Sequence, residues 1–331
     1  MIMKKISKIT ASILCMCLCL TFFACSFKEN QEKNDNSEKE KMSFDAKQPK
    51  SESNKNPDNP NIKKERKSKT ESKTLTPKKT TTDKSSKNNL QLEKAEIIIK
   101  ESVSGISGTV NYGFCDYKSN YTLIKDEGKT KAASVIKLFI MEYVYSLIEK
   151  GEITETDVIG SESIKTLVES MITVSDNNAT NILIDKFGME TINAYIKKQG
   201  YENTSLERKM LDTNAANAGF ENYTSVSDVL KFLNNLYANR EKFPQNRMLE
   251  IMKGQKISTK LRKNMPSDIE IASKTGELSD TQNDVAVVFT PKGDYAIVFI
   301  TQNAPSPQIN NAMAVCNRRL YDEIYGINSN N

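Results

Sequence analysis

Ser134 and Lys137 are the two residues of this sequence whose types and spacing best fit nucleophilic chemistry. They stand at the start of an apolar run, and residues three positions apart lie on one face of a helix. A serine hydroxyl is a weak nucleophile until a base takes its proton, and a lysine can be that base when burial or a nearby cation lowers its pKa. The positive end of a helix dipole also favours an anion that develops there. The spacing Ser-x-x-Lys occurs in this chain only at Ser134.

The chain contains no histidine at all. Its absence excludes Ser-His-Asp and Cys-His triads, and it also excludes zinc sites that depend on histidine. Covalent catalysis must therefore take its base from Lys, Asp, Glu or Tyr. The sequence implies neither a metal nor an organic cofactor.

Two further motifs follow along the chain, Ser-Asp-Asn at 175–177 and Lys-Thr-Gly at 274–276. Each has an ordinary structural explanation when it is taken alone. A short polar triplet between two helices usually caps the second helix. A lysine followed by a glycine fits an edge strand that ends in a turn. Only their combination with Ser134 and Lys137 argues for chemistry.

The elements that must position these motifs are read from hydrophobic periodicity. The residues of 135–150 are apolar nearly all round, which predicts a helix buried on every side. Glycines at 151, 188 and 200 predict helix ends. We expect strands at 110–114, 121–124, 268–274, 284–290 and 295–301, and further helices at 90–101, 161–172, 178–187, 190–198, 227–238, 246–252 and 308–325.

Strands at both ends with helices between them predict an α+β fold of the α/β sandwich type. One antiparallel five-stranded sheet is assembled from the two ends of the domain and flanked by the terminal helices. An all-helical lobe is inserted in the middle. The seam between the lobe and the sheet is the natural place for a site.

The three motifs, in this order and on these elements, resemble the signature set of serine β-lactamases and penicillin-binding proteins. The resemblance covers the whole folded part and is nearest to the class A-like enzymes. It implies that Ser134 attacks the β-lactam carbonyl carbon and that Lys137 is the acylation base. Ser175 would relay a proton toward the ring nitrogen, and Lys274 would add positive charge to the pocket and help keep Lys137 poised.

The same resemblance implies a set of substrate contacts. Asn177 would hydrogen-bond the amide of the substrate's side chain. The Thr275 hydroxyl and the backbone beside it, at Gly276, would meet the substrate carboxylate. The backbone N–H groups of Ser134 and Glu277 would form the oxyanion hole.

The sequence departs from the class A pattern in two places. Ser134 and Ser175 are only 41 positions apart, and this shortening predicts a more open site. Class A enzymes also carry a loop of pattern R-x-E-x-x-L-N whose glutamate activates the deacylating water, and here Met210 stands where that glutamate should be. A thioether cannot deprotonate water. Asp212 and Glu207 are the nearest carboxylates, and either would serve if the loop backbone is redrawn.

The N-terminal end predicts export. Residues 1–24 read as a secretory signal peptide, with lysines followed by an apolar run too short for a membrane span. Cys25 follows a small residue as in the lipobox of bacterial lipoproteins, although plain secretion or an uncleaved anchor is the alternative. Residues 25–89 are rich in Lys, Asn and Ser and predict a disordered tether. The catalytic domain is expected at 90–331.

The composition limits the partners. The net charge is +5, and the basic stretches of the tether fit a solvated spacer near anionic wall polymers or lipid head groups better than nucleic-acid binding. Cys115 and Cys316 are expected to be two packed thiols, with one disulfide as the alternative. We expect a monomer that binds a small β-lactam and is held at the outer face of the cell membrane, or is secreted.

Three functions remain open on the sequence alone. The first is a β-lactam hydrolase, which would give resistance to β-lactams. The second is a penicillin-binding protein or penicillin sensor that releases its acyl group slowly, because Met210 replaces the expected glutamate. The third is a surface module that keeps the fold without catalysis.

Overall fold

A five-stranded antiparallel sheet forms the centre of the folded part, in the order β2-β1-β9-β8-β7. The computed structural model describes residues 82–326, so the predicted signal peptide, Cys25 and most of the predicted tether lie outside the described residues. The strands are β1 (Thr109–Asp116), β2 (Tyr121–Lys125), β7 (Ile271–Leu278), β8 (Thr281–Val288) and β9 (Tyr295–Gln302). Two come from the N-terminal side of the domain and three from the C-terminal side, as predicted.

Strand β9 shows how the sheet joins two hydrophobic cores. Its residues alternate between the faces, and all but the last are buried. Tyr295, Ile297 and Phe299 belong to the core on one face, and Ala296 and Val298 belong to the core on the other. Because both faces are covered, the strand reads in the sequence as a continuous apolar run.

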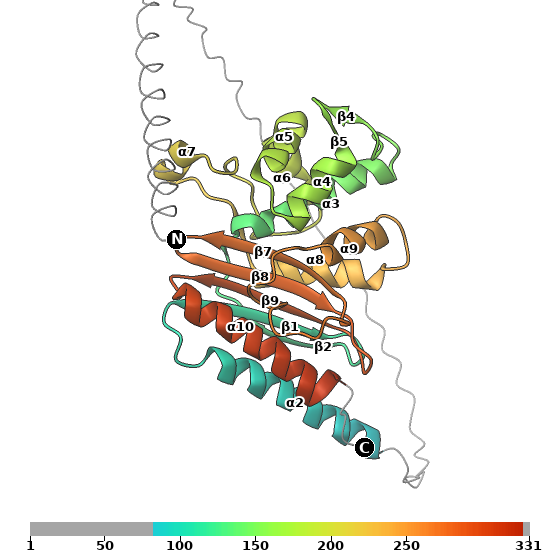
Figure 1. Cartoon of the computed structure of the whole chain (residues 1–331), viewed down its shortest axis with the longest axis vertical. Helices are drawn as coiled ribbons and strands as arrows, with labels where there is room; N and C mark the ends of the chain where they lie inside the picture. The colour runs from blue at the N-terminus through green and yellow to red at the C-terminus, as the bar shows by residue number, and fades with distance from the viewer. Residues whose placement is uncertain (1–81, 327–331) are drawn as a thin grey trace, which may run out of the picture. The chain divides into compact units, whose positions relative to one another are not determined.

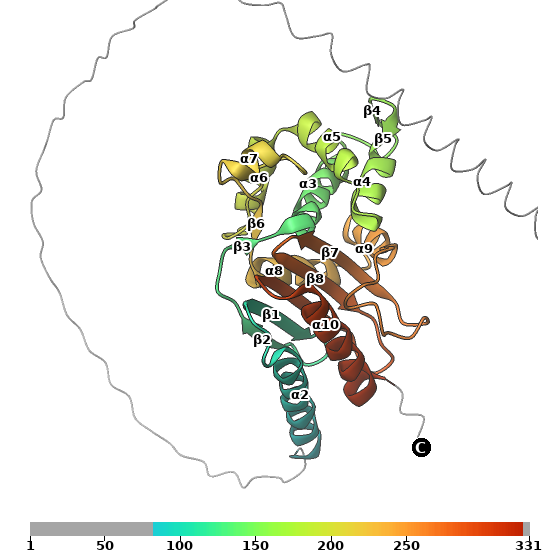
Figure 2. The same cartoon turned by 60° about the vertical axis from the view of Figure 1, so that its left-hand side comes forward.

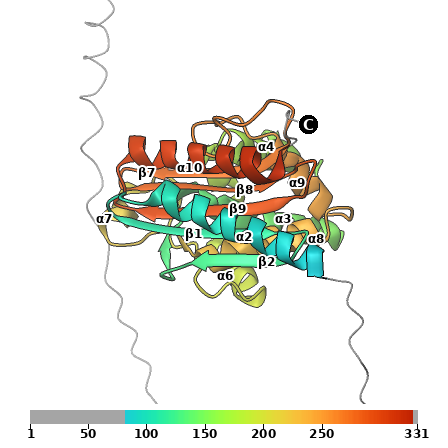
Figure 3. The same cartoon turned by 90° about the horizontal axis from the view of Figure 1, so that it is seen from below.

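Helices α2 (Thr82–Val103) and α10 (Ser306–Leu320) lie side by side across one face of the sheet (Figure 3). A π-helical turn, η2 (Tyr321–Tyr325), continues α10. Ala95, Ile98 and Ile99 of α2 are buried at helical spacing. The predicted start of this helix at residue 90 was wrong, because α2 begins at Thr82. The residues from 82 to 89 are polar and give no apolar period that would have marked them as helical.

The other face of the sheet carries the inserted helices (Figures 1 and 2). Gly113 of β1 allows α8 to pack closely there, since a Cβ at this position would lie 2.6 Å from side-chain atoms of Val226 and Leu230. The inserted helices are α3 (Lys137–Glu149), α4 (Ile164–Thr173), α5 (Asn177–Phe187), α6 (Met189–Lys198), α7 (Thr213–Asn217), α8 (Val226–Ala238) and α9 (Gln245–Lys253). The α+β class with an inserted helical lobe is therefore confirmed.

Helix α3 is the buried helix that the apolar run predicts, and its residues from Lys137 to Leu147 are all buried. Its predicted start was wrong in detail. The α-helix proper begins at Lys137, and a 3₁₀ turn, η1 (Ala133–Ile136), precedes it and carries Ser134. Residues three apart eclipse one another in such a turn. The predicted helix at 161–172 also begins later, at Ile164, where Ser163 caps it through the backbone N–H of Thr166.

The short elements were not predicted. They are the strand pairs β3 (Thr130–Lys131) with β6 (Tyr223–Thr224) and β4 (Val158–Ile159) with β5 (Glu162–Ser163), together with helix α7. A strand of two residues has no room for an alternating pattern. The β4–β5 hairpin occupies the shortened connection between α3 and α4, where the sequence departs from the class A length.

The described cysteines, Cys115 and Cys316, are both buried and free. Cys316 of α10 belongs to the hydrophobic core between this helix and the sheet. Burial raises the pKa of its thiol to about 12. Among residues 82–326, no helix is long and apolar enough to span a bilayer.

Glu142 is a buried acid inside α3, and it makes stability depend on pH. Tyr201 donates a hydrogen bond of 3.0 Å to its Oε1, whereas Oε2 has no partner among the described residues. Burial raises the pKa of Glu142 to about 7, against a lowering by the bond from Tyr201. The native state thus holds a proton that the unfolded chain has released, so stability falls as the pH rises from about 4.5 to about 7.

Replacing Glu142 by Gln is therefore expected to stabilise the protein at pH 8.5 and to change its stability little at pH 4. At about 1.4 kcal/mol for each unit of pKa, the gain at high pH is on the order of 3 kcal/mol. Urea unfolding of both proteins across this pH range measures it. Parallel stability curves for the two proteins would contradict the prediction.

Candidate active site

Ser134 lies on η1 where this turn meets the edge strand β7. Gly276 of β7 makes the approach possible, because a Cβ there would lie 2.9 Å from the Ala132 carbonyl oxygen and 3.1 Å from the Ser134 backbone nitrogen. The Lys-Thr-Gly motif lies inside β7, so the predicted end of this strand at residue 274 was wrong, and the alternative explanation of the glycine as a turn residue does not apply. The glycine is needed for the close contact with the turn that carries Ser134.

Lys137 points from the start of α3 toward the loop before α5. Its Nζ donates to the Ser175 carbonyl oxygen at 2.8 Å, to Ser175 Oγ at 3.2 Å and to Asn177 Oδ1 at 2.8 Å. Burial lowers the pKa of Lys137 to about 8, and the nearby charge of Asp176 partly opposes this effect. Among the hydrogen bonds of residues 90–326, none joins Lys137 to Ser134. The Lys137 ammonium group therefore binds the Ser-Asp-Asn motif and not the Ser134 hydroxyl.

Lys274 approaches the same hydroxyl from the sheet. Its Nζ donates to Ser175 Oγ at 3.0 Å and to the Thr275 carbonyl oxygen at 2.8 Å, and the residue is completely buried. Burial, with the positive charge of Lys137 beside it, holds the pKa of Lys274 well below its usual range. The Ser175 hydroxyl is thus held between two amines whose protons are more easily lost than those of a solvent-exposed lysine.

The Ser-Asp-Asn motif has both a structural and a chemical role in this geometry. Asp176 caps α5 by accepting from the backbone N–H groups of Asn178 and Ala179. Ser175 takes a backbone φ of 59°, a conformation unusual for a residue other than glycine. The cap fixes the loop, and the loop presents Ser175 and Asn177 to Lys137.

The free edge of β7 offers a backbone donor to the site. Gln282 of β8 directs its backbone N–H and C=O to the Thr301 hydroxyl of β9. Glu277 lies opposite Gln282, so its own N–H and C=O point away from β8, off the sheet edge. Glu277 N–H is therefore free to donate from the sheet edge, next to Gly276, which the Ser134 turn contacts.

A cavity of about 250 Å³ opens beside Ser134. Its walls come from the η1 turn, the α5 start, the end of β7 and the 208–222 loop. Met210, Asp212, Asn177 and Glu277 line it together with Ser134. The structure therefore gathers Ser134, Asn177 of the second motif, the residue that follows the Lys-Thr-Gly motif and the loop at one place, the predicted seam between lobe and sheet.

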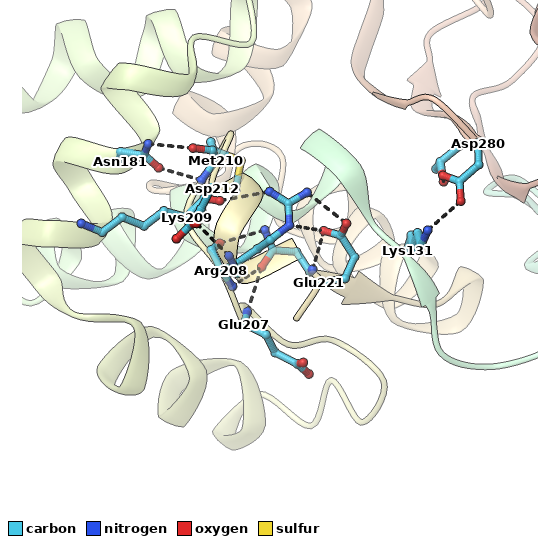
Figure 4. A network of polar contacts seen from close by, with 12 residues as sticks. Lys131, Asn181, Glu207, Arg208, Lys209, Met210, Asp212, Glu221 and Asp280 are labelled. Atoms are coloured by element: carbon cyan, nitrogen blue, oxygen red, sulfur yellow. Dashed lines mark hydrogen bonds and ion pairs between the residues drawn. The ribbon is translucent and has the colours of Figure 1, made fainter. Parts of the chain in front are cut away.

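An ion pair between Arg208 and Glu221 joins the two ends of the loop that carries Met210, and we call these ends the neck of the loop. Arg208 Nε lies 2.9 Å from Oε1 of Glu221, and Nη2 lies 3.0 Å from Oε2 (Figure 4). This bidentate pair is nearly buried. Asn222 then links the neck to the site, because its carbonyl oxygen accepts from the backbone N–H of Ala132 at 2.8 Å.

Met210 is fixed by Asn181 of α5. The Asn181 side chain accepts from the backbone N–H of Met210 at 2.8 Å and donates to its carbonyl oxygen at 3.0 Å (Figure 4). Met210 is buried in the hydrophobic core to which Ala296 and Val298 of β9 belong, and it is also one of the residues that line the cavity. The position where class A enzymes carry a glutamate is therefore filled by an apolar group.

Asp212 and Glu207, the two carboxylates that would replace the missing glutamate of the loop, lie in different places. Asp212 lines the cavity with Ser134, and its Oδ1 caps α7 by accepting from Ala215 N–H at 2.9 Å. Glu207 points away from the other labelled residues of the loop in Figure 4, and its Oε1 binds Lys129 and Ser205. Burial tends to raise the pKa of Glu207, but the bonds from Lys129 and Ser205 hold it below its usual value. The geometry thus favours Asp212 over Glu207.

Sequence reasoning missed two buried charges behind β7. The side chain of Lys260 is fully buried and forms an ion pair with Glu277, and Asp284 lies across from Thr275 on β8. Burial raises the pKa of Asp284 to about 6, against the lowering effect of Lys260. No spacing links Lys260 to the motifs, so no sequence pattern marked it. Residues 82–326 hold no group of three or more His, Cys, Asp or Glu side chains placed to bind a metal ion.

Curated relatives of this chain are β-lactamases. A β-lactamase from Bacillus licheniformis is 29% identical over 160 residues, which cover 46% of this chain and 52% of that protein. The β-lactamase AER-1 from Aeromonas hydrophila is 30% identical over 204 residues, which cover 57% of this chain and 64% of that protein. The chain thus matches only about half to two thirds of the length of these two relatives.

Solved structures show the same fold. A β-lactamase from Sphaerobacter thermophilus DSM 20745 aligns with a TM-score of 0.60 and 24% identity, over 68% of this chain and 95% of that one. The structure of PBP-A aligns with a TM-score of 0.58 and 24% identity, over 70% and 95%. Residues 94–324 match the model of the β-lactamase enzyme family, and the chain therefore belongs to that family.

Proposed function

We propose that this protein hydrolyses β-lactams through an acyl-enzyme on Ser134 and thereby gives resistance to them. The observation that carries the proposal is the Ser175 hydroxyl, which lies 3.2 Å from Lys137 Nζ and 3.0 Å from Lys274 Nζ. Two amines with lowered pKa values around one hydroxyl form a path for a proton. Asn177, which accepts from Lys137 Nζ, lines the same cavity as Ser134.

In the acylation step, Ser134 Oγ forms a bond to the carbonyl carbon of the β-lactam ring. Lys137 in its neutral form takes the hydroxyl proton. The C–N bond of the ring then breaks, and the proton passes through the Ser175 hydroxyl to the leaving nitrogen. The backbone N–H groups of Ser134 and Glu277 stabilise the negative charge on the carbonyl oxygen.

Three groups would hold the substrate during this step. The Thr275 hydroxyl, next to Lys274, would bind the carboxylate of the substrate. Asn177 uses its Oδ1 on Lys137, which leaves its NH₂ group to donate to the amide of the substrate side chain. A substrate carboxylate bound at this edge of the sheet would in turn favour the protonated form of Lys274.

Asp212 is the residue that we assign to deacylation. It shares the cavity with Ser134, and the glutamate position of the loop is occupied by Met210. In this step Asp212 takes a proton from a water molecule, and the water oxygen bonds to the acyl carbon. The ester bond to Ser134 Oγ then breaks, and the proton held by Asp212 returns to the Ser134 oxygen. The first test is steady hydrolysis of a chromogenic cephalosporin by the purified protein, with a transient mass adduct on the peptide that contains Ser134. A protein that gives neither colour nor adduct would overturn the assignment.

The alternative function is a penicillin-binding protein or sensor that keeps its acyl group. Met210 favours it, because an apolar side chain lines the cavity where the deacylating base would stand. A penicillin adduct on Ser134 that persists for many minutes in intact-mass measurements would support slow release. Rapid return to the unmodified mass would support hydrolysis.

The pH dependence of acylation should report the state of Lys137. Only its neutral form accepts the Ser134 proton, so the acylation rate is expected to rise about tenfold for each pH unit below 8 and to level off above it. Stopped-flow measurements with excess cephalosporin give this profile. The variant Lys137→Arg serves as the control, since its guanidinium keeps the positive charge and does not deprotonate. A flat profile in the unsubstituted protein would contradict the role of Lys137.

We further propose that the protein is exported and anchored to the outer face of the membrane by a lipid on Cys25, and that it acts there as a monomer without nucleic acid. The small residue before Cys25 and the preceding apolar run support this. Metabolic labelling with a fatty-acid analogue should mark the protein, and Cys25→Ala should remove the label. Cys19→Ala, within the signal peptide, is the matched control and should keep it.

A further inference from the structure

Lys260 places a fully buried cation next to the proposed active site. Its side chain has no exposed surface, and its Nζ pairs with Oε1 of Glu277. The side chain of Glu277, by contrast, is 51% exposed, and Glu277 is one of the residues that line the Ser134 cavity. A buried ammonium group requires a counter-charge. Glu277 is therefore the partly exposed counter-ion of this buried cation.

The other charges near Lys260 cannot exchange with solvent. Asp284 is buried, its Oδ2 accepts from the backbone N–H of Leu261 at 2.9 Å, and its Oδ1 has no partner among the described residues. Lys274 is also buried and is held by Ser175 and Thr275. Of the two carboxylates that compensate these lysines, only that of Glu277 is free to move away.

The position of Glu277 on β7 brings its carboxylate close to the proposed substrate carboxylate. Thr275 and Glu277 are two residues apart on one strand, so their side chains leave the same face, opposite to that of Gly276. The proposed function places the substrate carboxylate at the Thr275 hydroxyl. Two like charges on one face of a strand repel each other unless a cation lies between them or one of them leaves.

We propose that the Glu277 carboxylate is an internal stand-in for the substrate carboxylate, which displaces it from Lys260 when an anionic substrate binds. This inference rests on the proposed function and adds a specificity device to it. In the free protein Glu277 satisfies Lys260. In the complex the substrate supplies the same charge, and the Glu277 side chain turns into the solvent. A neutral substrate leaves the Lys260–Glu277 pair in place.

The variant Glu277→Gln tests the exchange because it keeps the size of the side chain and removes its charge. It should lower KM for a carboxylate cephalosporin about fivefold, the range of a half-exposed ion pair, and should leave KM for the methyl ester of the same compound unchanged. In a Lys260→Gln background the same substitution should no longer favour the acid over the ester. Equal effects of Glu277→Gln on acid and ester would overturn the proposal.

Asp280 offers a matched control for a general effect of negative charge. It lies in the turn after β7 and pairs with Lys131 at 2.6 Å, and its side chain is 30% exposed. Asp280→Asn removes a carboxylate near the same edge without touching Lys260. It should leave the preference for the acid as it is. A shift as large as that of Glu277→Gln would mean that overall charge, and not the exchange at Lys260, sets the preference.

A second measurement does not depend on β-lactam chemistry. In Glu277→Ala the buried Lys260 loses its counter-ion, and an acetate ion can take the place of the missing carboxylate. Added acetate should therefore raise the melting temperature of this variant more than that of the unsubstituted protein or of Asp280→Ala. No specific gain with acetate would overturn the claim that Lys260 accepts an external carboxylate. A protein that shows the acetate effect but is never acylated by a β-lactam would instead defeat the proposed function, and with it the substrate as the displacing group.

Discussion

Replacing Ser134 by alanine is expected to abolish acylation, with a loss on the order of a millionfold in the rate of β-lactam opening. The nucleophilic oxygen disappears, and residues 90–326 contain no histidine that would activate a different group. The cavity, the two lysines and Ser175 stay in place, since Ser134 makes no side-chain hydrogen bond among the described residues. Stopped-flow acylation and intact-mass spectrometry measure the effect.

Ser175→Ala and Ser102→Ala separate this result from a general loss of structure. Ser175 links Lys137 to Lys274, so its removal should slow acylation by about 100-fold or more and still leave an adduct on Ser134. Ser102 lies on α2, where its hydroxyl bonds the Ile98 carbonyl oxygen, and its removal should leave acylation unchanged. An adduct that forms in Ser134→Ala at the normal rate would refute the nucleophile.

In an Asp212→Asn background, replacing Met210 by glutamate is expected to speed the release of the acyl group by about 100-fold to 10,000-fold, the usual contribution of a positioned general base. The backbone of Met210 is held on both sides by Asn181, so a new side chain at this position starts from a fixed point in the cavity wall. Its carboxylate would face the same space as Ser134. Single-turnover decay of the cephalosporin adduct measures the change.

Met210→Gln is the matched control, because it has the same shape as the glutamate variant but no charge. In the same Asp212→Asn background it should release the acyl group no faster than Asp212→Asn alone. The variant Asp212→Asn belongs to the same series, although it also alters the cap of α7. Equal release rates in Met210→Glu and Met210→Gln would show that the loop does not direct position 210 at the acyl carbon.

Much of this architecture was predictable because its signals are periodic. The apolar runs marked the buried helix α3 and the three C-terminal strands, and the order of strands and helices predicted the sheet built from both ends. The motifs were placed on the right elements for the same reason. Asp176 shows that two explanations of one motif can hold together, since it caps α5 while its neighbours meet Lys137.

The rest depends on contacts that leave no local pattern. Lys260 lies in a polar segment 17 residues before Glu277, and only the fold brings the two together. The 3₁₀ turn at Ser134 and the position of Gly276 inside a strand follow from the close packing of η1 on β7, which is a tertiary contact. The hydrogen bonds of Lys137 to Ser175 and Asn177 have the same origin.

The closed neck of the Met210 loop also bears on how such a protein changes under antibiotic selection. Arg208 and Glu221 hold the ends of the loop, and Asn181 holds its middle, so a mutation at 210 alters one cavity wall without reopening the loop. The genetic code sets the remaining obstacle. The methionine codon ATG lies two base changes from the glutamate codon GAG, and every two-step route passes through AAG or GTG, so a lineage that gains glutamate by such a route first carries lysine or valine at this position.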